Sequence, residues 1–229
     1  MTASELREAE LADNLSVVQD RISQAAVAAH RNPDDVTLIV VTKTFPVSDA
    51  QALYRLGVRD FGENRDQEGS AKFPELPHDS RFHFQGQIQS KKLKSIVKWA
   101  RVIHSLDESK HAQIMADLGA SQEIFVQVSL DLAVGRGGVA PDELHDFLRD
   151  CISRLRLNIV GLMAVAPLGE DPSTAFERFA VIHQKAKSEF PQLRFLSAGM
   201  SGDFEAAIAA GATHVRVGSS ILGHRAPAT

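Results

Sequence analysis

The sequence predicts an α/β protein, a (β/α)8 TIM barrel with an extra helix at its N-terminus. The first observation is the run 36–44, which is apolar and β-branched on both faces, as in a parallel-sheet strand covered by helices. The second is that strand and helix patterns alternate eight times without a linker. Such a barrel typically needs about 250 residues, and the chain has 229. An open doubly wound sheet is the alternative, but it would not need eight uninterrupted units.

The N-terminal helix is predicted over residues 3–30. Leu11, Leu15, Val18 and Ile22 recur at helical spacing with charged residues between them, and Asn32-Pro33 ends the pattern. We therefore expect one domain, 1–229, with the helix inside 1–33 and the barrel over 36–224.

The first four strand–helix units follow this helix. Pro46 ends the first strand because proline has no N–H to donate, and Gly57 closes the next helix. Pro74 and Pro77 mark a loop. The patterns place strands at 36–44, 58–62, 81–84 and 102–106, and helices at 49–56, 64–73, 90–98 and 108–118.

Prolines and glycines mark the boundaries of the last four strand–helix units. Pro141 and Pro172 stand in the first turns of two predicted helices, where proline loses no hydrogen bond, and Gly211 closes a third helix. A glycine-rich loop, 135–138, follows the fifth strand. The patterns place strands at 124–130, 157–164, 194–197 and 214–218, and helices at 141–151, 171–190, 202–210 and 219–222.

Composition excludes several classes of protein. The apolar fraction is 44%, enough for a sizeable core, and the net charge of −4 argues against a nucleic-acid binder. Cys151 is the one cysteine, so an internal disulfide is impossible and we expect a buried structural thiol. The N-terminus lacks the apolar core of a signal peptide, and no apolar run reaches membrane-spanning length. We expect a cytoplasmic monomer.

Polar residues gather where the predicted strands end. In barrels of this class the active site lies at the carboxyl ends of the strands, so these residues should surround one mouth. They are Lys43, Glu63, Asn64, His83, Gln85, Ser105, Met163, Ser197, Ser201, Arg216 and Ser219.

Two turns of small residues, 197–202 and 216–220, follow strands seven and eight. Barrels commonly bind phosphate at this position, because backbone N–H groups are free there and glycine allows close approach. Ser201 and Ser219 could each be an ordinary helix N-cap. Two such turns on these two strands favour a phosphate site.

Two cationic residues interrupt buried strand patterns. Lys43 shares a strand face with Ile39 and Val41, so it either lays its stem on apolar surface and reaches water or acts as a Schiff-base lysine. Arg216 needs a partner in its buried strand, which could be a structural ion pair or a ligand. We find no Cys and His at metal-ligand spacing, no Gly-x-Ser-x-Gly elbow and no Walker A loop.

These segments together resemble the pyridoxal 5′-phosphate (PLP) homeostasis proteins, also called the PLP-binding or proline-synthase co-transcribed family. The resemblance runs in order from residue 36 to residue 224. The matching segments are Val41-Thr42-Lys43-Thr44, Phe61-Gly62-Glu63-Asn64, Gln67-Glu68-Gly69, His83-Phe84-Gln85-Gly86, Gly161-Leu162-Met163, Leu196-Ser197-Ala198-Gly199-Met200-Ser201-Gly202-Asp203, Glu205-Ala206-Ala207-Ile208 and Val215-Arg216-Val217-Gly218-Ser219-Ser220-Ile221-Leu222-Gly223.

The resemblance implies an alanine-racemase-like barrel that carries PLP on Lys43 as a Schiff base. The phosphate would be held by Ser201, Gly218 and Ser219, and Arg216 would meet the pyridine nitrogen. Arginine stays protonated, so it donates a hydrogen bond without protonating the ring. The matching segments also assign Asn64 and Met163 to the cofactor site.

The sequence departs from the family's usual pattern on one rim. Gln85 stands where an apolar residue is usual, Ser90 where asparagine is usual, and Arg136 in the glycine-rich loop where lysine is usual. The residues expected to contact PLP are unchanged.

The function implied by the resemblance is PLP homeostasis. The protein would carry or buffer PLP, influence the balance of amino acids and keto acids, and exchange PLP with PLP-dependent apo-enzymes. The alternative is a PLP-dependent racemase, which needs an acid/base on each face of the cofactor. We expect the chain to end after the eighth unit without a second domain, and Tyr54, the one tyrosine, to lie away from the mouth. A third possibility is a phosphate-binding barrel without a covalent cofactor.

Overall fold

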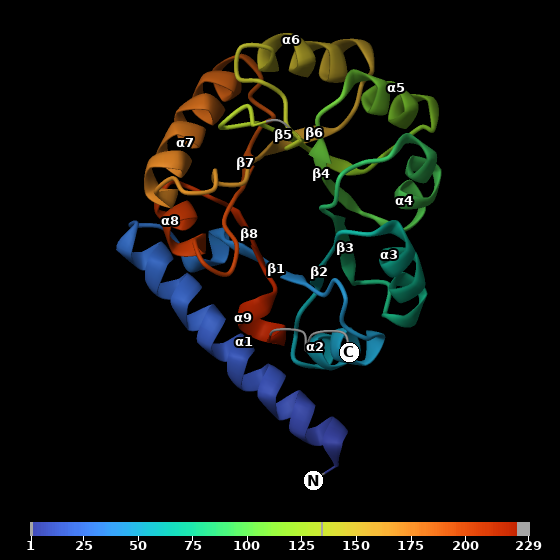
Figure 1. Ribbon diagram of the computed structural model, residues 1–229, viewed down its shortest axis with the longest axis vertical. Helices are drawn as coiled ribbons and strands as arrows, with labels where there is room; N and C mark the ends of the chain where they lie inside the picture. The colour runs from blue at the N-terminus through green and yellow to red at the C-terminus, as the bar shows by residue number, and fades with distance from the viewer. Residues whose placement is uncertain (1, 134, 224–229) are drawn as a thin grey trace.

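The computed structural model describes residues 2–133 and 135–223. Within these residues, eight parallel strands close into a barrel in chain order (Figure 1), which confirms the predicted (β/α)8 fold. The strands are β1 (Thr37–Val41), β2 (Asp60–Glu63), β3 (Arg81–Phe84), β4 (Val102–Leu106), β5 (Glu123–Gln127), β6 (Ile159–Met163), β7 (Phe195–Ser197) and β8 (His214–Val217).

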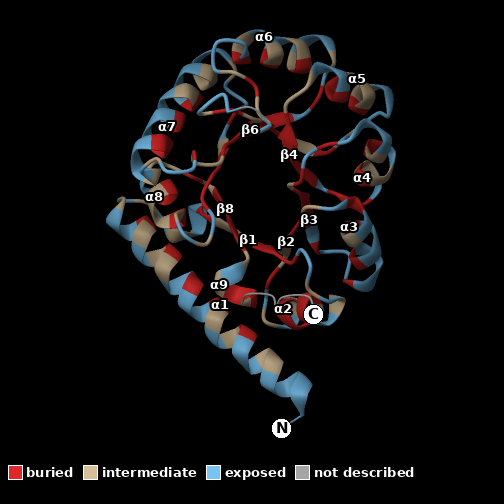
Figure 2. Ribbon diagram, viewed as in Figure 1, coloured by how far each residue is buried: buried red, intermediate tan, exposed pale blue. Residues whose placement is uncertain are grey.

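Helices follow every strand and form the outer ring (Figure 1). Their inner faces and the strands are buried, while their outer faces are exposed (Figure 2). The helices are α2 (Val47–Arg55), α3 (Asp66–Lys72), α4 (Leu93–Trp99), α5 (Ser109–Asp117), α6 (Leu144–Arg149), α7 (Pro172–Glu189), α8 (Phe204–Ala209) and α9 (Ser219–Leu222), with short 3-10 turns at Pro33–Asp35, Phe73–Glu75 and Ser90–Lys92.

The N-terminal helix, α1 (Ala3–Ala28), lies outside the barrel against α2, α8 and α9 (Figure 1). Its buried stripe contains Leu11, Leu15, Val18, Ile22 and Ala26, as the periodicity predicts. Burying each of the large aliphatic side chains contributes about 1.5–3 kcal/mol. The helix therefore covers the junction where the last strand meets the first.

The barrel interior is filled with side chains. An apolar cluster inside the barrel is formed by Val102, Phe125, Val160 and Met163. Beside it lie three buried histidines, and the ring of His104 stacks on Phe125 with centroids 4.5 Å apart. The other two histidines are His83 and His214.

Most predicted boundaries lie within two residues of the observed ones, and three differ by three residues. Residues 141–143 form a turn, so the helix expected at 141–151 begins at Leu144, and it continues as a π-helical segment, Asp150–Arg154. The strand expected at 124–130 ends at Gln127, because the glycine-rich loop returns and Val139 N donates to Gln127 O at 2.8 Å. The strand expected at 36–44 ends at Val41, which leaves Lys43 outside it. The expected end of the barrel, residue 224, lies outside the described residues.

None of the described helices is both long and apolar enough to cross a membrane.

Candidate functional site

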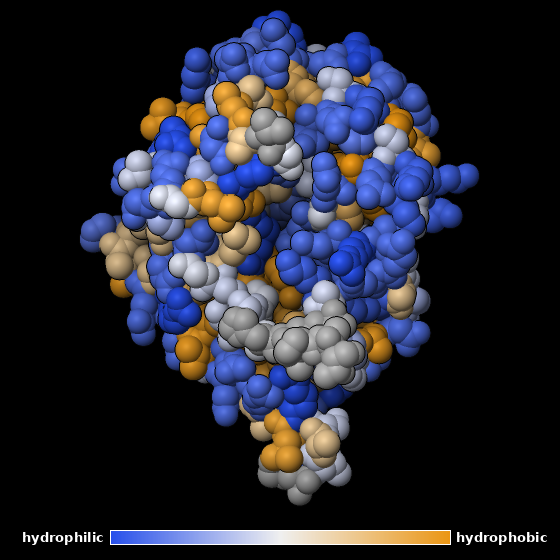
Figure 3. All heavy atoms as spheres, viewed as in Figure 1, coloured by the Kyte–Doolittle hydropathy of each residue, from blue (hydrophilic) through white to orange (hydrophobic). Residues whose placement is uncertain are grey.

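A cavity of about 670 Å³ opens where the strands end, and the face of the molecule is hollowed near the barrel axis (Figure 3). The structure brings to it all seven residues expected at the cofactor site, namely Lys43, Asn64, Met163, Ser201, Arg216, Gly218 and Ser219.

Lys43 stands in a tight turn directly after β1. Phe45 N donates to Thr42 O at 3.1 Å, and Thr44 has a φ of 67°, a left-handed conformation that is rare for a β-branched residue. Glu68 of α3 accepts from Thr44 N at 2.5 Å and braces the turn. The Lys43 side chain is exposed and lines the cavity, so its amine is accessible to a ligand there.

The turns after β7 and β8 meet at Ser201. Its Oγ accepts from Gly218 N at 3.3 Å and from Ser220 N at 3.4 Å. Ser201 is not an N-cap of the following helix, since Asp203 holds that position. A Cβ on Gly218 would lie 3.1 Å from Val41 O, so glycine lets the two strands' ends approach closely. The result is a small cluster of hydroxyl and backbone N–H groups beside the cavity.

Arg216 forms the inner wall of the cavity. Its Nη1 donates to Ser197 Oγ at 2.7 Å and its Nη2 to Ala164 O at 3.0 Å, and it is 5% exposed. Among the described residues its partners are this hydroxyl and this carbonyl, and it makes no ion pair with a carboxylate. Burial lowers the pKa of Arg216 to about 10, which still leaves it cationic at neutral pH. The guanidinium has further N–H donors available to a ligand in the cavity.

Four residues predicted at the mouth do not line the cavity. Glu63 is buried behind it, where its Oε1 accepts from Lys72 Nζ at 2.7 Å and Thr42 Oγ1 at 2.6 Å. Burial raises the pKa of Glu63, although the hydrogen bonds from Lys72 and Thr42 oppose that rise. The other three are His83, Ser105 and Ser197.

Sequence reasoning missed Asp107 and Gln127, which form the opposite rim together with the glycine-rich loop. Asp107 Oδ2 accepts from Gly138 N at 2.9 Å, and Gln127 Nε2 donates to Gly137 O at 2.8 Å. Burial raises the pKa of Asp107, while the Gly138 N–H opposes that rise. Asp107 and Gln127 both stand at strand ends, so the carboxyl-end rule could have found them.

Two other residues lie where the sequence predicts. Tyr54 is on α2, away from the cavity, and its OH donates to Asp79 Oδ1 at 2.7 Å. Cys151 is 1% exposed, and burial raises the pKa of its thiol to about 12, so it is a structural thiol.

The donor set around the cavity fits PLP. An amine at Lys43 suits an aldehyde, the N–H and hydroxyl groups around Ser201 suit a phosphate, and Arg216 offers a hydrogen-bond donor to a ring nitrogen. These groups surround one cavity of sufficient volume for such a ligand.

Known proteins that are similar to this chain are PLP-related. The family model "Alanine racemase, N-terminal domain" matches residues 7–226. A pyridoxal phosphate homeostasis protein from Corynebacterium glutamicum is 43% identical over 91% of this chain and 99% of its own. One from Mycobacterium tuberculosis is 38% identical over 96% of this chain and 94% of its own.

Solved structures similar to this chain include a family member and a more distant barrel protein. PipY of Synechococcus elongatus, solved with PLP bound, superposes with a TM-score of 0.79 and 32% identity over 93% of this chain and 100% of its own. Alanine racemase from Streptomyces coelicolor superposes with a TM-score of 0.71 at 18% identity, over 93% of this chain and 58% of its own. The racemase likeness shows a shared barrel fold.

Proposed function

The chain belongs to the pyridoxal phosphate homeostasis protein family, and from this premise we propose that it binds PLP in the cavity and carries or buffers it for other proteins. The single observation that carries the proposal is the convergence of Lys43, the Ser201 turn and Arg216 on one cavity. PLP supplies an aldehyde that combines reversibly with amines.

Each residue has a defined task in this proposal. The Lys43 amine forms the covalent link, and its braced turn holds it over the cavity. The Ser219 N–H and the Ser201 hydroxyl hold the phosphate together with the Gly218 N–H, which exchanges its long 3.3 Å bond to Ser201 Oγ for the phosphate. Asn64 and Met163 form part of the cavity wall, where Met163 is 3% exposed.

Arg216 separates this proposal from the racemase alternative. A guanidinium donates to the ring nitrogen but does not protonate it, so the cofactor is a weak electron sink and carbanion chemistry is poorly supported. Tyr54, a residue type that serves as the second base in racemases, hydrogen-bonds to Asp79 on the outer surface. We therefore propose a carrier that does not turn over amino acids.

The carrier function extends the proposal to partners and location. We propose that PLP-dependent apo-enzymes receive the cofactor, that amino-acid and keto-acid balance follows from this supply, and that the protein acts as a monomer in the cytoplasm. The free, buried thiol of Cys151 is compatible with a reducing compartment.

Borohydride reduction tests the attachment site. The purified protein, loaded with PLP, should absorb in the visible range and gain the reduced cofactor's mass on the peptide that holds Lys43. Lys43→Ala should gain none, whereas the control Lys91→Ala should behave as the wild type. A label on any other lysine would refute the assignment, and a colourless, unlabelled wild type would favour a barrel that binds phosphate without a covalent cofactor.

Transfer to an apo-transaminase tests the carrier function. Reactivation that persists when a phosphatase destroys free PLP would support direct hand-over, and reactivation that the phosphatase abolishes would support buffering through solution. Rapid interconversion of L- and D-alanine that Lys43→Ala abolishes would overturn the proposal in favour of the racemase.

A further inference from the structure

A continuous chain of polar side chains crosses the barrel interior from the start of β2 to the cavity. Asp60 Oδ1 lies 2.9 Å from His83 Nε2, and His83 Nδ1 lies 2.9 Å from His104 Nε2. His104 Nδ1 lies 3.0 Å from Ser197 Oγ, which in turn lies 2.7 Å from Arg216 Nη1. These five side chains come from five different strands.

The chain is sealed from water along most of its length. His83, His104 and Ser197 are 0% exposed and Arg216 is 5% exposed. The Asp60 side chain, at the amino-terminal end of the barrel, is 20% exposed. Buried polar atoms need their hydrogen bonds, so each link of this chain is costly to break.

The chemistry of the two ends sets the direction of every bond. Asp60 as a carboxylate can only accept, so His83 donates from Nε2 and its Nδ1 must accept from His104 Nε2. His104 Nδ1 is then an acceptor for the Ser197 hydroxyl proton, which leaves the Ser197 oxygen free to accept from Arg216. All donors thus point from Arg216 toward Asp60.

This assignment requires both imidazoles to be neutral, and their surroundings favour that. Burial lowers the pKa of His83, although the Asp60 carboxylate opposes that fall. Burial, together with the charge of Arg216, lowers the pKa of His104 well below its usual value. The stack of the His104 ring on Phe125 also fixes its plane.

We propose that Asp60 is a positioning residue for Arg216, acting through His83, His104 and Ser197 to hold the guanidinium in place at the cavity. The hydrogen-bond chain that begins at Arg216 Nη1 ends at the Asp60 carboxylate. The remote carboxylate keeps an acceptor in front of Arg216 Nη1, while Nη2 donates to Ala164 O and the remaining N–H groups are available to the ligand. The proposal rests on the proposed function only in taking that ligand to be PLP.

Histidine tautomers in the PLP-free protein test the direction of the chain. Long-range 1H–15N spectra should show protons on Nε2 of both His83 and His104 and none on their Nδ1 atoms. In Asp60→Ala the fixed acceptor is gone, so Nδ1 protonation should appear at His83 and His104. A wild type with Nδ1 protonated at either ring, or an Asp60→Ala variant with an unchanged pattern, would overturn the proposal.

PLP affinity tests the effect on Arg216. Asp60→Ala should weaken PLP binding by roughly 10-fold, the lower range for losing one hydrogen bond to a charged group. Ser197→Ala is the second variant, because it changes volume least. It should weaken binding similarly while His83 keeps its Nε2 proton.

His183→Gln is the control, since His183 is buried on α7 but its Nε2 pairs with Leu193 O, outside the chain. It should leave the tautomers of His83 and His104 and the affinity unchanged. Wild-type affinity in both Asp60→Ala and Ser197→Ala would overturn the proposal. A wild type that binds no PLP would count against the proposed function alone, because the tautomers are read without the ligand.

Discussion

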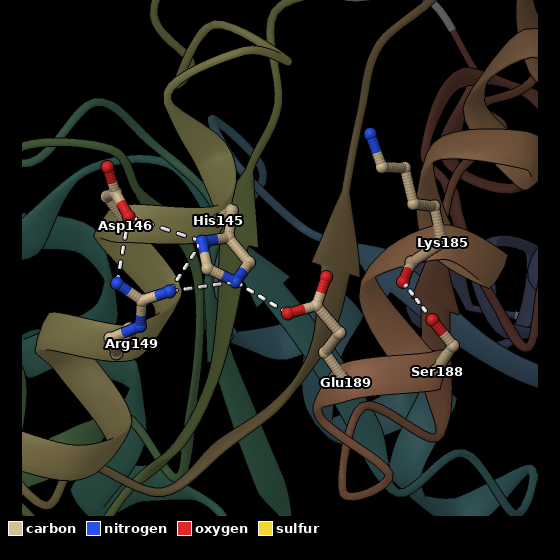
Figure 4. Close-up of polar contacts among 6 residues, drawn as sticks. All are labelled: His145, Asp146, Arg149, Lys185, Ser188 and Glu189. Atoms are coloured by element: carbon tan, nitrogen blue, oxygen red, sulfur yellow. Dashed lines mark hydrogen bonds and ion pairs between the residues drawn. The ribbon is translucent and has the colours of Figure 1, made fainter.

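Two of the protein's histidine–carboxylate contacts lie in contrasting places. Inside the barrel, His83 Nε2 lies 2.9 Å from Asp60 Oδ1, and the His83 side chain is 1% exposed. Outside, His145 Nε2 of α6 lies 2.6 Å from Glu189 Oε2 of α7 (Figure 4), with the side chains 38% and 52% exposed. The shorter contact is the one in water.

The two contacts also differ in the number of competing partners. The His145 ring is contacted by Asp146 and Arg149 as well as Glu189 (Figure 4), so it can exchange partners and water. Each nitrogen of His83 has a single partner and no access to solvent. Burial and unique pairing, more than distance, therefore determine how much a polar contact contributes to stability.

The buried ion pair of Lys72 and Glu63 should give the largest effect. Lys72→Met leaves the Glu63 carboxylate without its cation, and breaking a buried pair costs on the order of 3–5 kcal/mol of unfolding free energy. Lys110→Met is the control, because the Lys110–Glu108 pair has a similar distance, 2.6 Å against 2.7 Å, but is exposed. Urea unfolding should show a loss below about 1 kcal/mol for the control, and equal losses in both variants would contradict the comparison.

His83 and His145 should give the next largest difference in unfolding free energy. His83→Leu leaves the buried His104 Nε2 without a partner and Asp60 with only its longer contact to Arg81 Nε at 3.7 Å, at a cost of about 1–3 kcal/mol for the buried polar group left unpaired. His145→Leu removes a contact that water can replace, so its cost should stay below about 1 kcal/mol. Urea unfolding of the two variants would measure this, and a larger loss for His145→Leu would refute it.

His214, the third histidine of the barrel interior, gives a test by pH. Burial, together with the charges of His83, Arg81 and Arg216, lowers the pKa of His214 from 6.5 to about 3, although the Asp60 carboxylate opposes that fall. A histidine with a lowered folded-state pKa contributes its stability above pH 6.5 and loses it as the pH falls toward about 3, because the unfolded chain takes up a proton that the folded chain does not.

His214→Gln should therefore make the acid limb of stability against pH less steep by about 1.4 kcal/mol per pH unit below the unfolded pKa. Urea unfolding at several pH values would measure the two slopes. His145→Asn keeps all three interior rings and should retain the wild-type slope. Parallel wild-type and His214→Gln curves would contradict the assignment.

Salt should give the smallest effect. Charges in the exposed His145–Glu189 cluster are screened at high ionic strength, so the difference between wild type and Glu189→Gln should stay under about 1 kcal/mol and shrink from low salt to about 1 M. The difference between wild type and Lys72→Met should change little, because Lys72 and Glu63 are sealed from the solution. Melting curves at both salt concentrations would compare them.

The sequence by itself determined the barrel and one side of the site. Apolar runs and the glycines and prolines that bound them are local signals. Eight strand–helix units in alternation are compatible with few folds. The rule that the active site of such a barrel lies at the carboxyl ends of the strands then predicted that Lys43, Ser201 and Arg216 surround one mouth. That part was predictable because it depends on position along each strand.

Only the tertiary structure decided which interior side chains face one another. Asp60 and His104 each looked like an ordinary residue of a buried strand, and His83 was predicted at the mouth. No spacing between the three residues marks a chain. Their contacts depend on strand register and on how the closed barrel brings β4 opposite β7, where His104 reaches Ser197. The same holds for Asp107 and the returning glycine-rich loop. Local patterns say which way a side chain points, whereas closure of the sheet decides what it meets.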